Sequence, residues 1–441
     1  MMTLKILSVA GARPNLMKIA AICEAIKKIN GRAAGEEEIH HVLVQVREHA
    51  HSKRSDPLFN DLELPQPDIY LEIGSASDSI QLARLMELLE PVLLSERPDV
   101  VLTLGNTNST LACALVAKKI WCAGDHGAEP FIPKVAHVEA GSRSFDRTLP
   151  DEINGIVTDS ISDYLFTTEE SANRNLLRQG VSNDRVFFVG NVLIDTLLRC
   201  HSEAHRSTIL QDLQLANGAE VKPYSILSLQ RPDDDSRVLS QILQALLDVS
   251  KRTPIIFPAH AETLNRIQKE RLTDYFVDHF IQDPEPWDER VRIRLIPHLG
   301  YLDFLHLMSN AKVVFTDSGG IQDETTMLGV PCITLSDRTN RPVTLERGTN
   351  VLVGWHPEKI ITEFNQAYRK NKSQPKRSPR YWDGNAAQRI VKVLLDDFYS
   401  QRSLDRRGWG VDPAPEEQSE TVFVHRPHKG ESSPSPRRRW R

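Results

Sequence analysis

Cysteine, excess positive charge and long apolar runs are scarce in this sequence, and each scarcity argues against a class of protein. Five scattered cysteines among 441 residues provide neither a disulfide framework nor a metal cluster. A formal net charge of −5 argues against broad nucleic-acid binding. No apolar run reaches the roughly 20 residues that span a membrane, and the run in MMTLKILSVAGARP is too short for a signal peptide. We therefore expect a cytoplasmic protein with no metal, no nucleic-acid partner and no membrane partner.

The composition that remains is that of a globular chain with an atypical end. Hydrophobic residues make up 40% and charged residues 26%, and the length favours more than one domain. After about residue 403 the chain turns to Pro, Ser, Glu and Arg. We predict that residues 404–441 form a disordered tail, because this composition buries too little apolar surface to fold alone.

Apolar strand patterns alternate with amphipathic helix patterns along the rest of the chain. The first series predicts strands at 4–11, 40–46, 99–105, 134–141, 164–168 and 185–191, and helices at 15–29, 79–96, 108–120 (with Asn108 or Ser109 as cap) and 152–162. A second series predicts strands at 224–230, 254–260 and 292–299, with helices at 236–251, 262–276 and 301–310. Such alternation predicts parallel sheets covered on both faces.

The fold class is therefore α/β, with two doubly wound, Rossmann-like domains. We place them at residues 1–197 and 198–375, followed by a C-terminal helix at 376–403 that packs back across them. Ligands of such folds bind beyond the carboxyl ends of the strands. Polar or glycine-containing turns fall at those ends, at 11–15, 105–108, 137–141, 190–191, 260 and 318–320. Each turn alone reads as a cap or a solvated loop, but their convergence favours one shared site.

The stretch VVFTDSGGIQDETTMLGVPCITL at 313–335 reads as strand, turn, helix and strand. Two glycines allow a close backbone approach, and a helix N-terminus suits an anion. Asp323 and Glu324, one helical turn later, would repel a bare anion but accept hydrogen bonds from hydroxyls beside it. A sugar phosphate combines both features. The alternative is a plain turn in which Ser318 caps the helix.

Six stretches together carry a family resemblance. In chain order they are GARPNLMKIA, NSTLACALVAKK, AHVEAGSRSFDRTLPDEIN, FVGNVLIDTL, DSGGIQDETTMLGVPCITL and WDGNAAQRI. Over roughly residues 4–395 the chain resembles the non-hydrolysing UDP-N-acetylglucosamine 2-epimerases. The resemblance implies a GT-B fold, in which two Rossmann-like domains face a central cleft. It also implies inversion of sugar C2 by elimination and re-addition of UDP, with no cofactor.

The resemblance assigns roles to particular residues. Its catalytic positions are Glu139, Glu152, Asn106 and Gln230. The 318–320 turn would face the diphosphate, Glu324 the ribose, and Arg13 the nucleotide phosphates, where a guanidinium fork suits phosphate oxygens. The full set of expected substrate-binding residues is Arg13, His49, Arg143, Asn191, His260, Ser318, Gly319, Gly320, Glu324 and Arg341. The expected ligand is a UDP-sugar, and a second copy of the chain is the candidate protein partner.

Several positions depart from the family pattern, including the segment QVREH, of which only His49 matches, and Thr339-Asn340-Arg341-Pro342. Asn106 stands where an aspartate is usual, Gln230 where a histidine is usual, and Gly155 where an arginine is usual. Neither an amide nor glycine can exchange a proton near neutral pH. Two alternatives therefore stay open beside the epimerase. One is an enzyme that acts on, or hydrolyses, another nucleotide sugar, and the other is a non-catalytic protein that binds a nucleotide sugar.

Overall fold

The structure is a computed structural model that describes residues 3–11, 13–32, 38–47, 57–124, 129–218, 220–229, 236–259, 261–276, 293–369 and 378–407. The chain divides into two compact units, Met1–Leu395 and Asp396–Arg441. The second unit is described only as far as residue 407, so most of the tail predicted at 404–441 lies outside the described residues.

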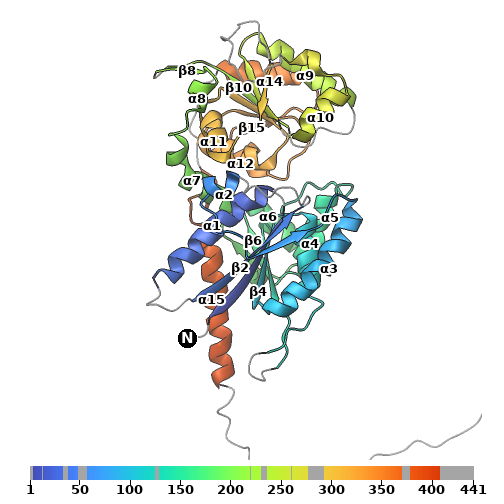
Figure 1. Ribbon diagram of the computed structural model, residues 1–441, viewed down its shortest axis with the longest axis vertical. Coiled ribbons are helices and arrows are strands. Elements are labelled where there is room, and N and C mark those ends of the chain that lie inside the picture. The colour runs from blue at the N-terminus through green and yellow to red at the C-terminus, as the bar shows by residue number, and fades with distance from the viewer. Residues whose placement is uncertain are drawn as a thin grey trace, which may run out of the picture. The chain divides into compact units, whose positions relative to one another are not determined.

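A seven-stranded parallel sheet forms the first half of the larger unit, in the order β3-β2-β1-β4-β5-β6-β7 (Figure 1). Its strands are β1 (Leu4–Ala10), β2 (Ile39–Arg47), β3 (Ile69–Glu72), β4 (Val100–Leu104), β5 (Lys134–Val138), β6 (Tyr164–Thr167) and β7 (Val186–Phe188). The strand order reverses between β1 and β4. In a doubly wound sheet this reversal opens a crevice at the carboxyl ends of the strands, where ligands bind.

Helices cover both faces of this sheet. They are α1 (Arg13–Asn30), α2 (Pro57–Asp61), α3 (Asp78–Glu96), α4 (Asn108–Ala117), α5 (Pro150–Ile161), α6 (Glu170–Arg178) and α7 (Val192–Ala204). On α3, Leu85, Leu89 and Leu93 recur every four residues and form one buried stripe. The stripe packs in one apolar cluster with Val101 of β4, so the periodicity of α3 fixes which face it turns to the sheet.

A second parallel sheet follows, in the order β12-β11-β10-β13-β14-β15. Its strands are β10 (Ser225–Ser228), β11 (Ile255–Ala259), β12 (Ile293–Pro297), β13 (Val313–Thr316), β14 (Cys332–Thr334) and β15 (Asn350–Leu352). Its helices are α9 (Ser236–Ser250), α10 (Ala261–Lys269), α11 (Tyr301–Asn310), α12 (Gly319–Leu328), α13 (Pro342–Glu346) and α14 (Pro357–Arg369). The short α8 (Ile209–Asp212) and the antiparallel pair β8 (Ala216–Asn217) and β9 (Glu220–Val221) connect the two halves. Two Rossmann-like sheets of the GT-B type are therefore present, as the sequence predicted.

The C-terminal segment returns to the first sheet's elements. Trp382 donates from Nε1 to the carbonyl of Thr168 at 3.0 Å, and the amide of Ala387 donates to Asp195 of α7 at 2.8 Å. The helix α15 (Ala386–Arg407) begins there with a buried apolar stripe. It begins later than the predicted residue 376 and continues past residue 403.

Several local predictions were wrong: the helix predicted at 262–276 ends at Lys269, the strand predicted at 185–191 ends at Phe188, and two further cases concern α4 and β5. The cap of α4 is Thr107, with extended φ and ψ, and the helix begins at Asn108, so neither Asn108 nor Ser109 is the cap. The strand predicted at 134–141 ends at Val138, because Glu139 adopts a left-handed φ of 70° that no strand continues.

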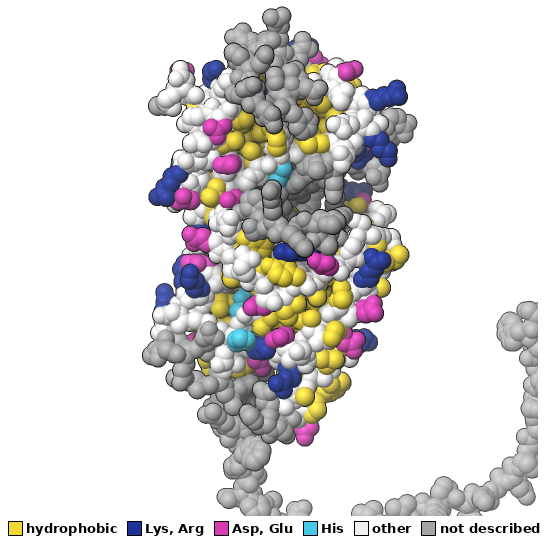
Figure 2. All heavy atoms as spheres, viewed as in Figure 1, with side chains coloured by type: hydrophobic (Ala, Val, Ile, Leu, Met, Phe, Trp, Pro, Cys, Tyr) yellow, Lys and Arg dark blue, Asp and Glu magenta, His cyan; other side chains and the backbone are white. Residues whose placement is uncertain are grey.

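The surface carries mixed charge. On the face seen in Figure 2, Lys and Arg side chains lie among Asp and Glu side chains. Among the described residues, no helix is long and apolar enough to cross a membrane.

Candidate functional site

Glu139 stands at the centre of a buried charge network. It follows β5 directly and is only 3% exposed. Its left-handed φ is a strained conformation for a residue with a side chain, and such strain is concentrated at functional sites. Its Oε2 accepts from Lys18 Nζ of α1 at 2.8 Å and from Arg341 Nη2 at 2.9 Å. Its Oε1 is buried without a hydrogen-bonding partner among the described groups.

The two cations set the charge of Glu139. Burial acts to raise its pKa, but the charges and hydrogen bonds of Lys18 and Arg341 outweigh burial and lower the pKa to about 2. Burial acts to lower the pKa of Arg341. The negative charges of Glu139 and Asp323 outweigh burial, so the pKa of Arg341 lies above its ordinary value. Glu139 is therefore a carboxylate, and Arg341 a guanidinium, at neutral pH.

Asp323 of α12 continues the network from Arg341 back to the elements of the first sheet. Its Oδ2 lies 3.2 Å from Arg341 Nε and accepts from Asn191 Nδ2 at 3.0 Å. Asn191 also caps α7, because its Oδ1 accepts from the Leu193 amide at 3.0 Å. Burial raises the pKa of Asp323 to about 7, although Arg341 acts to lower it. A chain of contacts thus runs from α1 through Glu139, Arg341 and Asp323 to the start of α7.

The glycine turn at 318–320 lies directly beside Arg341. A Cβ at Gly319 would come within 3.2 Å of Asn340 Oδ1 and 3.6 Å of Arg341 Cγ, so glycine lets the Arg341 segment approach. At Gly320 a Cβ would lie 3.3 Å from Leu193 of α7. Ser318 occupies the N-cap position of α12, but its side chain makes no capping hydrogen bond. The predicted anion site at this helix N-terminus and the Arg341 guanidinium are therefore neighbours.

Glu324 is buried one helical turn into α12. Its Oε1 accepts from the Tyr301 hydroxyl of α11 at 2.8 Å. Burial raises its pKa to about 7, an effect that the hydrogen bond from Tyr301 opposes and the nearby Asp323 reinforces. The predicted ribose contact of Glu324 stays a prediction, and it would have to share this carboxylate with Tyr301.

Glu152 of α5 organises the loop that follows Glu139. Its Oε2 accepts from the amide and hydroxyl of Ser144, at 2.7 and 2.9 Å, and its Oε1 accepts from the Phe145 amide at 3.2 Å. Phe145 has a φ of 62° and is 72% exposed. Both expected catalytic carboxylates thus adjoin strained backbone in one loop.

Arg143 forms hydrogen bonds that hold the turn after Glu139 in place. Its Nη2 donates to Asp159 at 2.6 Å and to Gln179 at 2.7 Å. Asp159 also contacts His137 Nδ1 at 2.7 Å and accepts from the Gly141 amide at 3.0 Å. These contacts fix the turn that presents Glu139. A substrate contact by Arg143 stays a prediction, since two of its donors are already engaged within the protein.

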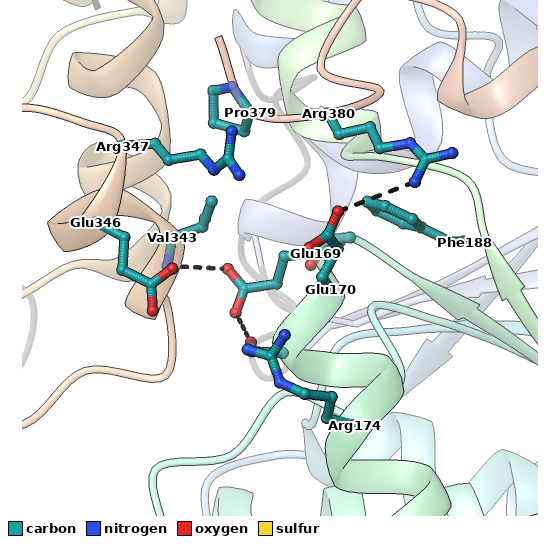
Figure 3. A pocket seen from close by; sticks show the side chains of 11 residues that line it. Glu169, Glu170, Arg174, Phe188, Val343, Glu346, Arg347, Pro379 and Arg380 are labelled. Atoms are coloured by element: carbon teal, nitrogen blue, oxygen red, sulfur yellow. Dashed lines mark hydrogen bonds and ion pairs between the residues drawn. The ribbon is translucent and has the colours of Figure 1, made fainter. Parts of the chain in front are cut away.

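A small cavity of about 50 Å³ lies next to the Arg341 segment (Figure 3). Figure 3 shows Glu169, the N-cap residue of α6, reaching α13, where it accepts from the Val343 amide at 3.3 Å. Burial raises the pKa of Glu169, while Ser171 and Arg341 act to lower it. Glu170 and Arg380 form a loose pair at 3.9 Å on the rim. Glu169 therefore adds negative potential behind Arg341.

The structure brings together several residues that the sequence nominated. Glu139, Arg341, Asn191 and the 318–320 turn are linked through the contacts above, and Gly105, which precedes Asn106, lies beside Glu139. The side chain of Arg13, and the whole of His49, Gln230 and His260, lie outside the described residues. The sequence analysis missed Lys18 as a site residue and considered Asp323 only as an acceptor for ligand hydroxyls. The available signal for Lys18 was a lysine at helical spacing within the buried stripe of α1, since Ile19 and Ile22 beside it are fully buried.

Metal ligands do not gather at this site. Within the described ranges, no group of three His, Cys, Asp or Glu side chains is placed to hold an ion. What the geometry offers instead is two buried cations and a helix N-terminus for an anion, beside carboxylates for proton transfer.

Comparison with known proteins gives one family over most of the chain. A family model described as UDP-N-acetylglucosamine 2-epimerase matches residues 32–395. A protein of Methanocaldococcus jannaschii named UDP-N-acetylglucosamine 2-epimerase is 35% identical over 401 residues, which cover 90% of this chain and 100% of the relative. A Pseudomonas aeruginosa protein named UDP-2,3-diacetamido-2,3-dideoxy-D-glucuronate 2-epimerase is 30% identical and covers 89% of this chain and 99% of the relative.

The fold comparison agrees. The crystal structure of the Methanocaldococcus jannaschii UDP-GlcNAc 2-epimerase in complex with UDP-GlcNAc and UDP superposes with a TM-score of 0.76 and 34% identity. The match covers 89% of this chain and 100% of that one.

Proposed function

Because the chain belongs to the UDP-N-acetylglucosamine 2-epimerase family, we propose that it interconverts UDP-N-acetylglucosamine and UDP-N-acetylmannosamine. One observation carries the proposal: the Arg341 guanidinium, the glycine turn that begins α12 and the carboxylate of Glu139 meet at one place. The guanidinium and the glycine turn suit a diphosphate. The carboxylate suits proton transfer and charge stabilisation at the sugar carbons next to that diphosphate. The reaction eliminates UDP to leave a glycal and then adds UDP back with C2 inverted.

The diphosphate would bind where Arg341 now pairs with Glu139. The amides of the first turn of α12 and its positive dipole end favour an anion. Arg341 can then offer its fork to phosphate oxygens, exchanging one anion for another. This exchange would free Glu139 from its hydrogen bond to Arg341. Lys18 Nζ, 2.8 Å from Glu139 Oε2, would still hold the carboxylate in its orientation.

Glu139 then has two tasks. As a carboxylate it stabilises the positive charge that develops at C1 while the C1–O bond breaks. Its unpartnered Oε1 can accept the C2 proton, the C2–H electron pair forms the C1–C2 double bond, and the C1–O electrons leave with UDP. Loss of the Arg341 contact raises the proton affinity of Glu139, so nucleotide binding itself would activate the base.

Inversion needs a proton delivered to the opposite face of C2. Glu152 is the carboxylate that the family resemblance assigns here, on the helix that also carries Gly155. Its present hydrogen bonds from Ser144 and Phe145 hold it in one orientation. Re-addition of UDP at C1 then restores the diphosphate bond to the sugar, with no net oxidation.

A second candidate function rests on Asn106. Its neutral carboxamide replaces a carboxylate that is usual in the family, which favours action on a different nucleotide sugar, and the Pseudomonas aeruginosa relative is named for such a sugar. The test is incubation with UDP-N-acetylglucosamine in deuterated water, followed by NMR. Deuterium at C2 together with the manno product supports the epimerase. Free UDP without epimer supports hydrolysis, and binding without turnover contradicts catalysis on this sugar.

A matched variant sharpens this test. Glu139→Gln keeps the size of the side chain but removes the base, so we expect C2 exchange to fall by about 10² to 10⁴. Exchange that persists at the unmodified rate would show that another group removes the proton.

A further inference from the structure

Asn106 sits at the edge of the charge network, in the turn that ends β4. The preceding Gly105 has a φ of 66°, and a Cβ there would lie 3.4 Å from Lys18 Nζ and 3.8 Å from Glu139 Oε2. The Gly105 carbonyl is held by His137 Nε2 at 2.8 Å. The backbone at Gly105 is therefore held close to Glu139, the proposed base. Asn106 is the next residue in this turn.

Gly155 of α5 lies directly against the Asn106 side chain. A Cβ at Gly155 would be 2.8 Å from Asn106 Oδ1, 2.9 Å from its Cγ and 3.0 Å from its Nδ2. These three nearly equal distances mean that the flat carboxamide lies face-on to the helix backbone. Glycine inside a helix is unfavourable compared with alanine, because it loses more backbone entropy on folding. Its presence within α5 therefore has a structural reason, namely the room that Asn106 occupies.

The Asn106 carboxamide has no hydrogen-bonding partner within the described part of the chain. Only the backbone carbonyl of Asn106 is engaged, by Asn154 Nδ2 at 3.2 Å. Two other groups around the same turn, Glu139 Oε1 and Asn15 Nδ2, are buried and unpaired among the described groups. Buried polar groups are normally paired, so these two buried open groups beside the half-buried Asn106 carboxamide indicate the place of a polar ligand.

We propose that Asn106 is a sugar-binding residue and that Gly155 is the positioning residue that holds its carboxamide in place. This inference rests on the proposed function and deepens it. A carboxamide donates from nitrogen and accepts at oxygen but cannot titrate, so it matches an uncharged group with both capacities, such as the acetamido group or a hydroxyl of the sugar. Proton transfer then belongs to the carboxylates Glu139 and Glu152, and Asn106 orients the sugar between them.

The test is a double-mutant cycle on Gly155→Ala and Asn106→Ala, with UDP-N-acetylglucosamine as substrate. The methyl group introduced by Gly155→Ala displaces the carboxamide, and Asn106→Ala removes it. We expect each single change to lower kcat/KM about tenfold, mainly through KM, because the lost hydrogen bond exists in the ground state as well. The double variant should lose about tenfold in total, not about a hundredfold, because Gly155 acts only through Asn106.

Two further measurements separate positioning from folding. The double variant relieves the contact, so its melting temperature should match that of Asn106→Ala even if Gly155→Ala alone folds poorly. Ser160→Ala, on the exposed side of the same helix, controls for the change in helix propensity and should leave kcat/KM within about twofold. The Kd for UDP alone, which lacks the sugar, should change by no more than about twofold across the cycle.

Several outcomes would overturn the inference. One is a loss of kcat/KM of about a hundredfold in the double variant, which is the product of the two single losses. Another is a Gly155→Ala variant whose kcat/KM stays within about twofold of that of the unmodified protein. If the unmodified protein binds UDP-N-acetylglucosamine without converting it, the proposed function fails, and the same ratios are then read from the Kd of this sugar nucleotide. Absence of any binding by the unmodified protein would end both proposals.

Discussion

The Arg341 guanidinium reaches across 202 positions of the chain to donate to Glu139, from Nη2 to Oε2 at 2.9 Å. Both side chains are buried, and the same guanidinium lies 3.2 Å from Asp323 through Nε. A buried ion pair gains Coulomb energy but loses hydration, so its net stabilisation is small, whereas removal of one partner leaves a buried charge uncompensated. This asymmetry makes the pair an easily tested feature of the molecule.

Replacement of Glu139 by Gln should destabilise the fold. The neutral amide leaves Lys18 and Arg341 facing each other without their shared anion, and the expected loss is about 3–5 kcal/mol in the free energy of unfolding. Urea denaturation of the two proteins measures it. Glu170→Gln is the control, because its exposed pair with Arg380 at 3.9 Å should contribute no more than about 1 kcal/mol. Equal losses in both variants would show that Glu139 is not the centre of the network.

Removal of the Lys18 charge should make stability less sensitive to acid. Burial acts to raise the pKa of Glu139, and Lys18 is the strongest of the influences that lower it to about 2. A carboxylate with a lowered pKa contributes stability that is present above its ordinary value near 4.5 and is lost as pH falls through the folded value.

In Lys18→Met the folded pKa of Glu139 lies closer to its ordinary value, so less stability is lost as pH falls. Melting temperatures measured from about pH 3 to pH 7 should differ most from those of the unmodified protein near neutrality and converge with them on the acidic side. Parallel curves would mean that Lys18 does not set the charge state of Glu139.

Replacement of Glu324 by Ala should weaken UDP binding. A buried hydrogen bond to a charged acid is worth about 1.5–3 kcal/mol, which corresponds to at least about a tenfold change in Kd. Calorimetry with UDP measures the change. Tyr301→Phe removes the hydroxyl that now donates to Glu324 at 2.8 Å, and it shows how much of the loss comes from that contact. An unchanged Kd in Glu324→Ala would show that Glu324 does not contact the bound nucleotide.

The buried Glu324 should also lower stability as pH rises toward neutrality. Burial is the largest influence that raises its pKa, from an ordinary 4.5 to about 7. Between these values the folded state holds a proton that the unfolded state has released, so the contribution is fully present below about pH 4.5 and is lost as pH rises through 7. Glu324→Gln keeps an acceptor for Tyr301 but does not titrate.

The melting temperature of Glu324→Gln should therefore fall less between about pH 5 and pH 8 than that of the unmodified protein. A change of the same size in both proteins would leave Asp323, whose pKa burial also raises to about 7, as the group responsible.

Local sequence patterns were sufficient to predict the two sheets, most of their strands and helices, and the turns that carry the site. These features follow from local patterns, such as the four-residue spacing of Leu85, Leu89 and Leu93, and from the rule that parallel strands end at one edge. The same patterns also placed Glu139 and the 318–320 turn at such edges.

Which of these groups are in contact, and which charges they hold, depends on the three-dimensional fold. It put Lys18 and Arg341 on the same oxygen of Glu139, engaged Arg143 with Asp159, and laid Asn106 against Gly155. Partners so far apart in the chain leave no periodic pattern between them, and a pKa depends on burial and on charges that the fold alone assembles. The chemistry of the site therefore follows from distances of a few ångströms that no local sequence pattern encodes.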